Sequence, residues 1–84
     1  MKKIVIDGEK IDNREMLFAS LKEQLQSEGF QGNNLDALYD ALTGLGQAAE
    51  LEVRNPGALY EKLGSYANRL VRVFLDAEEY REQA

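Results

Sequence analysis

Two short β-type segments, separated by a long stretch of helical pattern, constrain the fold of this chain most strongly. The first is KKIVI at residues 2–6, a β-branched run closed by Asp7-Gly8, and the second is ELEVR at residues 50–54, where polar and apolar residues alternate. Because helices lie between them, we expect the strands to form a parallel pair with a right-handed crossover. The expected fold class is α/β, with a small parallel sheet packed by helices.

Four helices are expected, in the order β-α-α-β-α-α. Asp12 begins a D-x-x-E capping pattern before the first helix, Asn34 is a favourable N-cap for the second, and Asn55-Pro56 opens the third. The helices are expected at residues 13–27, 35–43, 56–63 and 66–83. With no repeat and no linker, residues 1–84 are expected to form a single domain.

Neither cysteine nor histidine occurs among the 84 residues. Their absence excludes disulfides, cysteine nucleophiles, Ser-His-Asp triads and histidine zinc sites, so we expect no enzyme of these classes and no cofactor. The N-terminus lacks a signal-peptide core, and no apolar run approaches the length of a membrane helix. The expected location is therefore cytoplasmic, with no membrane partner.

The charge of the chain is concentrated in its middle. Ten Lys and Arg stand against fifteen Asp and Glu, a net charge of −5 that disfavours direct binding to nucleic acid. Between Glu23 and Val53 there is no Lys or Arg. The acidic residues of this segment are Glu23, Glu28, Asp36, Asp40, Glu50 and Glu52. This segment is either a solvated surface that favours solubility or a patch for a cationic partner.

The second predicted helix carries two acidic residues at positions that lower helix stability. Asp36, Tyr39, Asp40 and Thr43 occupy positions i, i+3, i+4 and i+7, so they share one stripe. The two like charges repel each other by a few tenths of a kcal/mol, and the helix dipole opposes Asp40 near the C-terminal end. Such unfavourable placements are typical of functional sites, and Tyr39 suits an interface anchor. The alternatives are a half-buried Tyr39 beside solvated acids, or a hydrolase or cation site at Asp36 and Asp40.

The segment FQGNNLDALYDALTG at residues 30–44 resembles the signature of the barstar family, the intracellular inhibitors of barnase-type ribonucleases. That signature runs aromatic-x-G-x-N-L-D-A-L-W-D-A-L-T-G. The opening KKIVIDGEKI, the LEVR of the second strand and the VF of the last helix fit in the same order, so the resemblance covers nearly the whole chain. It implies an inhibitor that uses no cofactor, performs no chemistry and binds a basic, barnase-like ribonuclease.

The resemblance also implies roles for single residues. Asp40 would mimic a phosphate and meet the basic cluster of the enzyme, Asp36 would pair with a neighbouring basic group, and Phe30 would stack on the catalytic histidine. Four residues would make surrounding contacts: Asn34, Tyr39, Thr43 and Gly44. Asp76, on the last helix, would reach the rim of the enzyme. The alternative is a barstar-like acidic binding module for a different basic protein.

The sequence departs from the family pattern in two ways. Tyr39 and Leu45 replace tryptophans, which reduces contact area, and Phe30 replaces a tyrosine. The sequence also ends at Ala84, after the last predicted helix, where the family continues into a third parallel strand. The chain is then a shortened variant, a truncated piece, or a protein that completes its sheet by association. If the first strand lies in the middle of the sheet, as the resemblance implies, we expect it to have an open edge, with Ile4, Val5 and Ile6 less covered and self-association through that edge.

Overall fold

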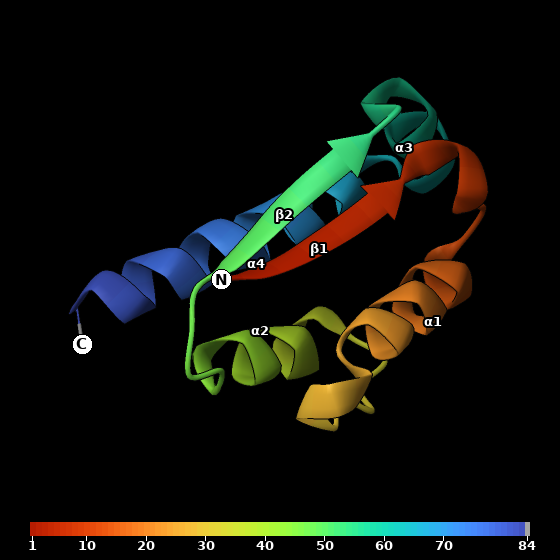
Figure 1. Cartoon of the computed structure of the whole chain (residues 1–84). Helices are drawn as coiled ribbons and strands as arrows, with labels where there is room; N and C mark the ends of the chain where they lie inside the picture. The colour runs from red at the N-terminus through yellow and green to blue at the C-terminus, as the bar shows by residue number, and fades with distance from the viewer. Residues whose placement is uncertain (84) are drawn as a thin grey trace.

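The computed structural model describes residues 1–83, which follow the expected order of strands and helices (Figure 1). The strands are β1 (Lys2–Asp7) and β2 (Ala49–Arg54), and the α-helices are α1 (Arg14–Gln24), α2 (Leu35–Thr43), α3 (Pro56–Leu63) and α4 (Ser65–Gln83). Two short 3₁₀ turns, η1 (Gly8–Lys10) and η2 (Gln26–Glu28), follow β1 and α1. The expected α/β class, with helices packed on a small parallel sheet, is confirmed.

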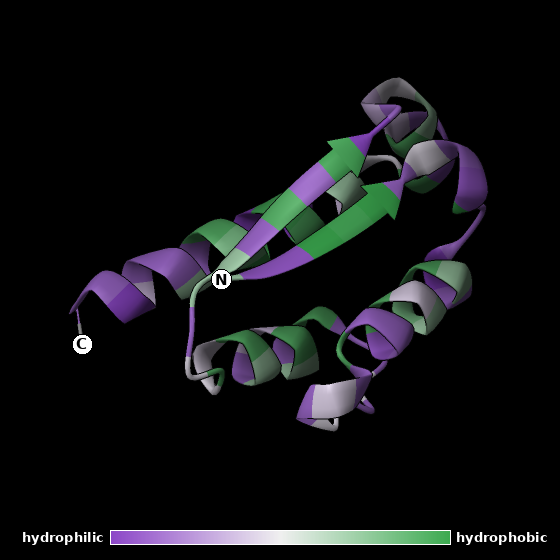
Figure 2. Cartoon of the chain, in the orientation of Figure 1, coloured by the Kyte–Doolittle hydropathy of each residue, from purple (hydrophilic) through white to green (hydrophobic). Residues whose placement is uncertain are grey.

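The two strands form a parallel sheet with one apolar and one charged face. The register runs from Lys2 beside Ala49 to Asp7 beside Arg54, which places Ile4 next to Leu51. Apolar and charged residues alternate along β2, as Figure 2 shows. On the charged face, Lys3 Nζ lies 2.9 Å from Glu52 Oε1. This ion pair raises the pKa of Lys3 and lowers that of Glu52, chiefly because the two side chains are hydrogen-bonded to each other.

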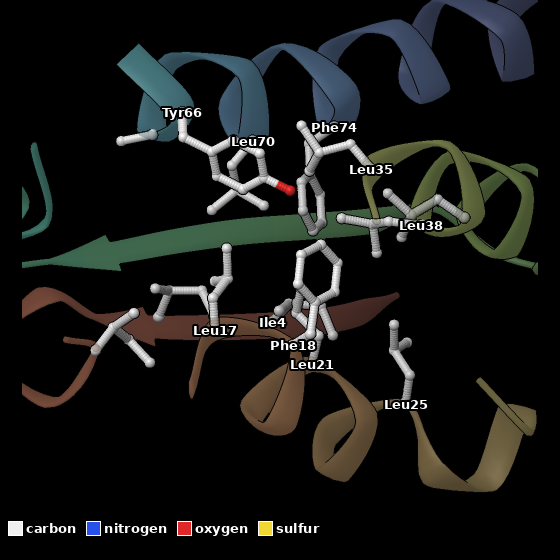
Figure 3. Close-up of a cluster of buried hydrophobic side chains, with 14 of the residues drawn as sticks. Ile4, Leu17, Phe18, Leu21, Leu25, Leu35, Leu38, Tyr66, Leu70 and Phe74 are labelled. Atoms are coloured by element: carbon white, nitrogen blue, oxygen red, sulfur yellow. The ribbon is translucent and has the colours of Figure 1, made fainter. Parts of the chain in front are cut away.

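The apolar face of the sheet is covered by side chains from α1, α2 and α4 (Figure 3). Ile4 from β1 is fully buried among them. The labelled side chains of the cluster are Leu17, Phe18, Leu21 and Leu25 from α1 and its end, Leu35 and Leu38 from α2, and Tyr66, Leu70 and Phe74 from α4. Each fully buried leucine contributes roughly 1.5–3 kcal/mol relative to exposure. This shared core fixes the position of α2 relative to the sheet.

None of the helices within residues 1–83 is both long and apolar enough to cross a lipid bilayer.

The start and end of α1 differ from the sequence expectation. The cap is Asn13, whose Oδ1 accepts a hydrogen bond of 2.9 Å from Met16 N–H, and not Asp12. The α-helix ends at Gln24, short of the expected Ser27, because η2 tightens the last turn before Gly29 takes a left-handed conformation with φ 76°.

The caps of α2 and α3 are of different kinds. Asn34 caps α2 as expected: its Oδ1 accepts a 2.8 Å hydrogen bond from Ala37 N–H. Asn55 precedes α3 with a left-handed φ of 52°, but its side chain makes no cap. Its amide instead donates to Asp7 Oδ1 at 2.8 Å and so joins the ends of the two strands.

A side chain caps the middle of the free edge of β1. Val5 N–H donates to Gln24 Oε1 at 2.8 Å, and Gln24 Nε2 donates to Val5 O at 2.7 Å, so the amide group takes the place of a neighbouring strand. Ile4 and Ile6 are both 0% exposed. The expectation that this strand would lose its cover is therefore wrong. The sheet order is β1-β2, and among residues 1–83 no side chain caps the edge of β2 that faces away from β1.

Candidate partner-binding face

Helix α2 presents one apolar and one acidic side. Leu35, Leu38 and Leu42 are buried in the core, whereas Asp36 and Asp40 are exposed. The two stripes expected from the sequence are thus both present. Because the buried leucines hold the helix along its whole length, the two carboxylates project from a fixed support.

Asp36 and Asp40 form no ion pair with any Lys or Arg that the structure describes. Other acids of the middle segment are already neutralised: Glu28 lies 3.5 Å from Lys2 Nζ, and Glu52 is paired with Lys3. Glu23 and Glu50 are also outside the ion pairs that the structure describes, so α2 carries two of the four acidic residues of this segment whose charge is available to a partner.

The C-terminal end of α2 is satisfied from within. The Thr43 hydroxyl group donates to the carbonyl oxygens of Tyr39 and Asp40, at 3.0 and 3.2 Å, and Gly44 N–H donates to Asp40 O at 3.0 Å. These bonds occupy carbonyl groups that a helix end would otherwise leave to water. Thr43 and Gly44 therefore fix the turn that carries the Asp40 carboxylate.

A shallow hollow of about 360 Å³ lies beside that turn. Its lining includes Glu28, Asp40 and Gly44. Sequence reasoning counted Glu28 only as part of the acidic segment, because nothing local shows that η2 lies next to the end of α2. The structure brings it to the same surface as Asp40, so two carboxylates border this hollow.

The loop before α2 differs from the expectation for Phe30. Its side chain is only 5% exposed and belongs to the core cluster, so the ring is not available for stacking in this conformation. Phenylalanine lacks the hydroxyl group that would favour keeping the ring at the surface. Gly32 lies close against it: a Cβ there would come within 2.7 Å of the Phe30 ring and 2.4 Å of Ala37 Cβ. The loop is thus packed down onto α2.

The segment after α2 is attached to the end of α4. Arg81 Nη2 donates to Leu45 O at 2.8 Å and also to Gln47 O. A guanidinium group has several donors in a fixed plane, so it can hold two carbonyl oxygens at once. The contact ties the α2–β2 connection to α4.

Two tyrosines join α2 to α4 on the acidic side. The rings of Tyr39 and Tyr80 meet edge to face, with centroids 6.5 Å apart and planes at 71°. Tyr39 is half-buried, and Tyr80 is 52% exposed. With Asp76 and Glu79 they line a hollow of about 280 Å³. The structure thus brings Asp76 and Tyr39 to the same hollow and adds Tyr80, which sequence reasoning missed.

Asp76 is partly neutralised before any partner arrives. Its Oδ1 lies 3.2 Å from Arg72 Nε, one turn earlier on α4. Asp76 therefore offers a partner less unbalanced charge than Asp36 or Asp40.

The assembled face suits docking better than chemistry. Within residues 1–83 no group of three His, Cys, Asp or Glu side chains is placed to hold a metal ion. Asp36 and Asp40 lie on the exposed side of a helix, where water solvates both. Fixed, exposed carboxylates beside the half-buried ring of Tyr39 are suited to a complementary cationic surface.

Comparison with known proteins agrees with this geometry. The family described as "Barstar (barnase inhibitor)" matches residues 1–84. A protein of Bacillus subtilis (strain 168), named "Putative ribonuclease inhibitor YrdF", is 40% identical over 80 residues, which cover 94% of this chain and 88% of that protein. Barstar proteins are inhibitors and not enzymes. The chain therefore belongs to the barstar family.

Proposed function

We propose that this protein inhibits a basic, barnase-like ribonuclease by placing α2 and the loop before it over the enzyme's active site. The observation that carries the proposal is the pair Asp36 and Asp40: exposed, without an intramolecular ion pair, and held on a helix with both ends satisfied. Membership of the barstar family and the name of the Bacillus subtilis relative support it.

The proposed mechanism is imitation of a substrate phosphate. An RNA-cleaving site that binds phosphate has to present cationic donors, and the Asp40 carboxylate offers two acceptor oxygens to such donors. Asp36, one turn away, would pair with a neighbouring base. Because α2 is already fixed by its core leucines and caps, little conformational entropy is lost when the carboxylates are bound.

Residues around the two carboxylates have supporting roles in the proposal. Tyr39 and Asp76 would contact the rim of the enzyme, and Asn34, Thr43 and Gly44 would maintain the helix ends and make peripheral contacts. To stack on a histidine, Phe30 would first have to leave the core. We therefore propose that Phe30 supports the loop before α2 in the free protein.

The test compares three variants with the same purified barnase-type ribonuclease. Asp40→Ala should weaken inhibition about 10–100-fold or more, because it removes a charge-assisted interaction and leaves the enzyme's cations unpaired. Asp40→Glu should retain more of the inhibition. Glu61→Ala, which removes a carboxylate from the exposed surface of α3, is the matched control and should inhibit like the wild type. Equal inhibition by Asp40→Ala and Glu61→Ala would refute the phosphate-mimic assignment.

The burial of Phe30 favours a second candidate, a barstar-like acidic module for a different basic protein. A pocket with a phosphate site and a histidine uses both a carboxylate and a stacking ring, whereas a generic cationic surface needs only the charge. Tight binding to another basic protein, with no inhibition of barnase-type ribonucleases, would favour this second candidate.

A further inference from the structure

The outer edge of β2 has unpaired backbone groups. Lys2 N–H donates to Ala48 O at 2.9 Å, and the direction of the N–H and C=O groups alternates along a strand. The groups of Ala49, Leu51 and Val53 therefore point away from β1. Among residues 1–83 no hydrogen bond from a side chain or another segment reaches them, unlike the Gln24 contact at the edge of β1. Such an edge is a template for another strand.

An apolar groove of about 580 Å³ follows this edge. Helix α4 passes behind β2 (Figure 1), and the two elements supply most of the lining. The apolar lining residues from these two elements are Ala49, Leu51 and Val53 of β2, and Val71, Phe74 and Leu75 of α4. Leu75 is 56% exposed. An open edge beside an apolar groove fits an extended segment whose backbone pairs with the strand and whose side chains enter the groove.

We propose that the occupant is β2 of a second copy of this chain, paired in antiparallel orientation about a twofold axis. The charged residues of β2 select the register. With Glu52 opposite Glu52 of the second copy, Glu50 lies opposite Arg54 at both ends, and Leu51 lies opposite Val53 on the apolar face. A shift that places Leu51 opposite Leu51 sets Glu50 against Glu52, which is repulsive. The opposite shift, with Val53 opposite Val53, sets Glu52 against Arg54 but leaves Glu50 opposite Pro56, which lies outside the strand and has no N–H, so fewer residues pair. The central Glu52 of each copy remains paired with Lys3 when Arg54 turns to Glu50 of the second copy.

The twofold pairing has two structural consequences. It makes a four-stranded sheet whose outer strands are the two copies of β1, each capped at Val5 by Gln24. Because a twofold contact uses the same edge of both copies, the assembly closes at two copies. The pairing also brings the two grooves together and covers Leu75. The groove faces Val71 and Leu75 of α4, whereas Asp76 and Tyr80 line the hollow beside Tyr39. The face proposed for the ribonuclease therefore stays accessible in both copies, and the inference does not depend on that function.

The test is sedimentation equilibrium of the whole chain over a range of concentrations. We expect a reversible dimer of a 9.5 kDa chain. Glu50→Arg and Arg54→Glu each place like charges at both ends of the register and should each raise the dimer dissociation constant about tenfold or more. An equimolar mixture of the two variants has opposite charges at both ends and should recover dimerisation, as should the double variant. Glu61→Arg, the same change on α3, should leave the dimer unchanged.

Circular dichroism melts verify that each variant is folded. Leu75→Lys is a second test of the dimer, because it changes an exposed residue of the groove and leaves the sheet unaltered. This variant should also weaken dimerisation. A chain that stays monomeric at all concentrations would overturn the proposal, as would variants and mixtures that behave like the wild type. A monomeric chain that binds an added β-branched peptide at this edge would instead assign the groove to a strand from another source.

Discussion

The amide of Gln24 replaces a strand at the edge of β1, and its removal should have a measurable cost. Gln24→Met keeps the size of the side chain but loses both hydrogen bonds to Val5. Each bond is worth about 0.5–1.5 kcal/mol net, and the half-buried position of Val5 lets water replace part of it. We expect a loss of about 2 kcal/mol, which lowers the Tm of a domain this small by about 8–16 °C.

The measurement is thermal and urea denaturation followed by circular dichroism, with Gln26→Met as the matched control. Gln26 is exposed and close to Gln24 in the chain, so the same substitution there should leave the Tm nearly unchanged. Gln24→Met should also promote association, because it uncovers a strand edge that the wild type covers. Equal melting temperatures for the two variants would show that the amide contributes nothing, and the reasoning would fail.

Three further predictions concern packing, pH and salt. Gly8→Ala should destabilise the fold by about 1–3 kcal/mol or more, because the new Cβ would come within 2.3 Å of Asn55 O and 2.6 Å of a second backbone atom. Gly46→Ala is the control, since a Cβ there meets nothing within 4 Å. The urea midpoints of the two variants test this. Hydrogen bonds from Asn55 and from Glu9 N–H hold the pKa of Asp7 below its ordinary value of 3.8. The stabilisation from these bonds is therefore present above that pH and lost as the pH falls below it. Asp7→Ala should make the urea midpoint depend less on pH between pH 7 and pH 2. In stopped-flow measurements, association with a basic ribonuclease should slow markedly as salt rises while dissociation changes less, and a salt-independent rate would contradict steering by the acidic segment.

Features fixed by neighbouring residues could be predicted from the sequence. The capping of α2 by Asn34 and the span of α2 depend on contacts within one or two turns, and both are confirmed. The acidic stripe of α2 follows from helical spacing alone. The α/β class followed in the same way, from the alternation of short strands with helices.

Features that depend on distant segments could not be predicted. Whether the edge of β1 is covered depends on Gln24, which is 19 positions from Val5 and carries no pattern that marks it. The orientation of Phe30 is decided by the space left between α1, α2 and α4, which no local motif reports. Tyr80 becomes part of the candidate face only because α4 packs against α2 and brings it to Tyr39.

The Arg81 contact has a consequence for synthesis of the chain. Arg81 lies 36 positions after Leu45, and α2 itself packs on α4. The acidic helix therefore cannot reach its final position on the ribosome until translation has passed residue 81 and the end of α4 has emerged. Until then a nascent chain holds Asp36 and Asp40 on an undocked segment. We therefore expect binding competence to appear late and abruptly during translation, and not to grow gradually with chain length.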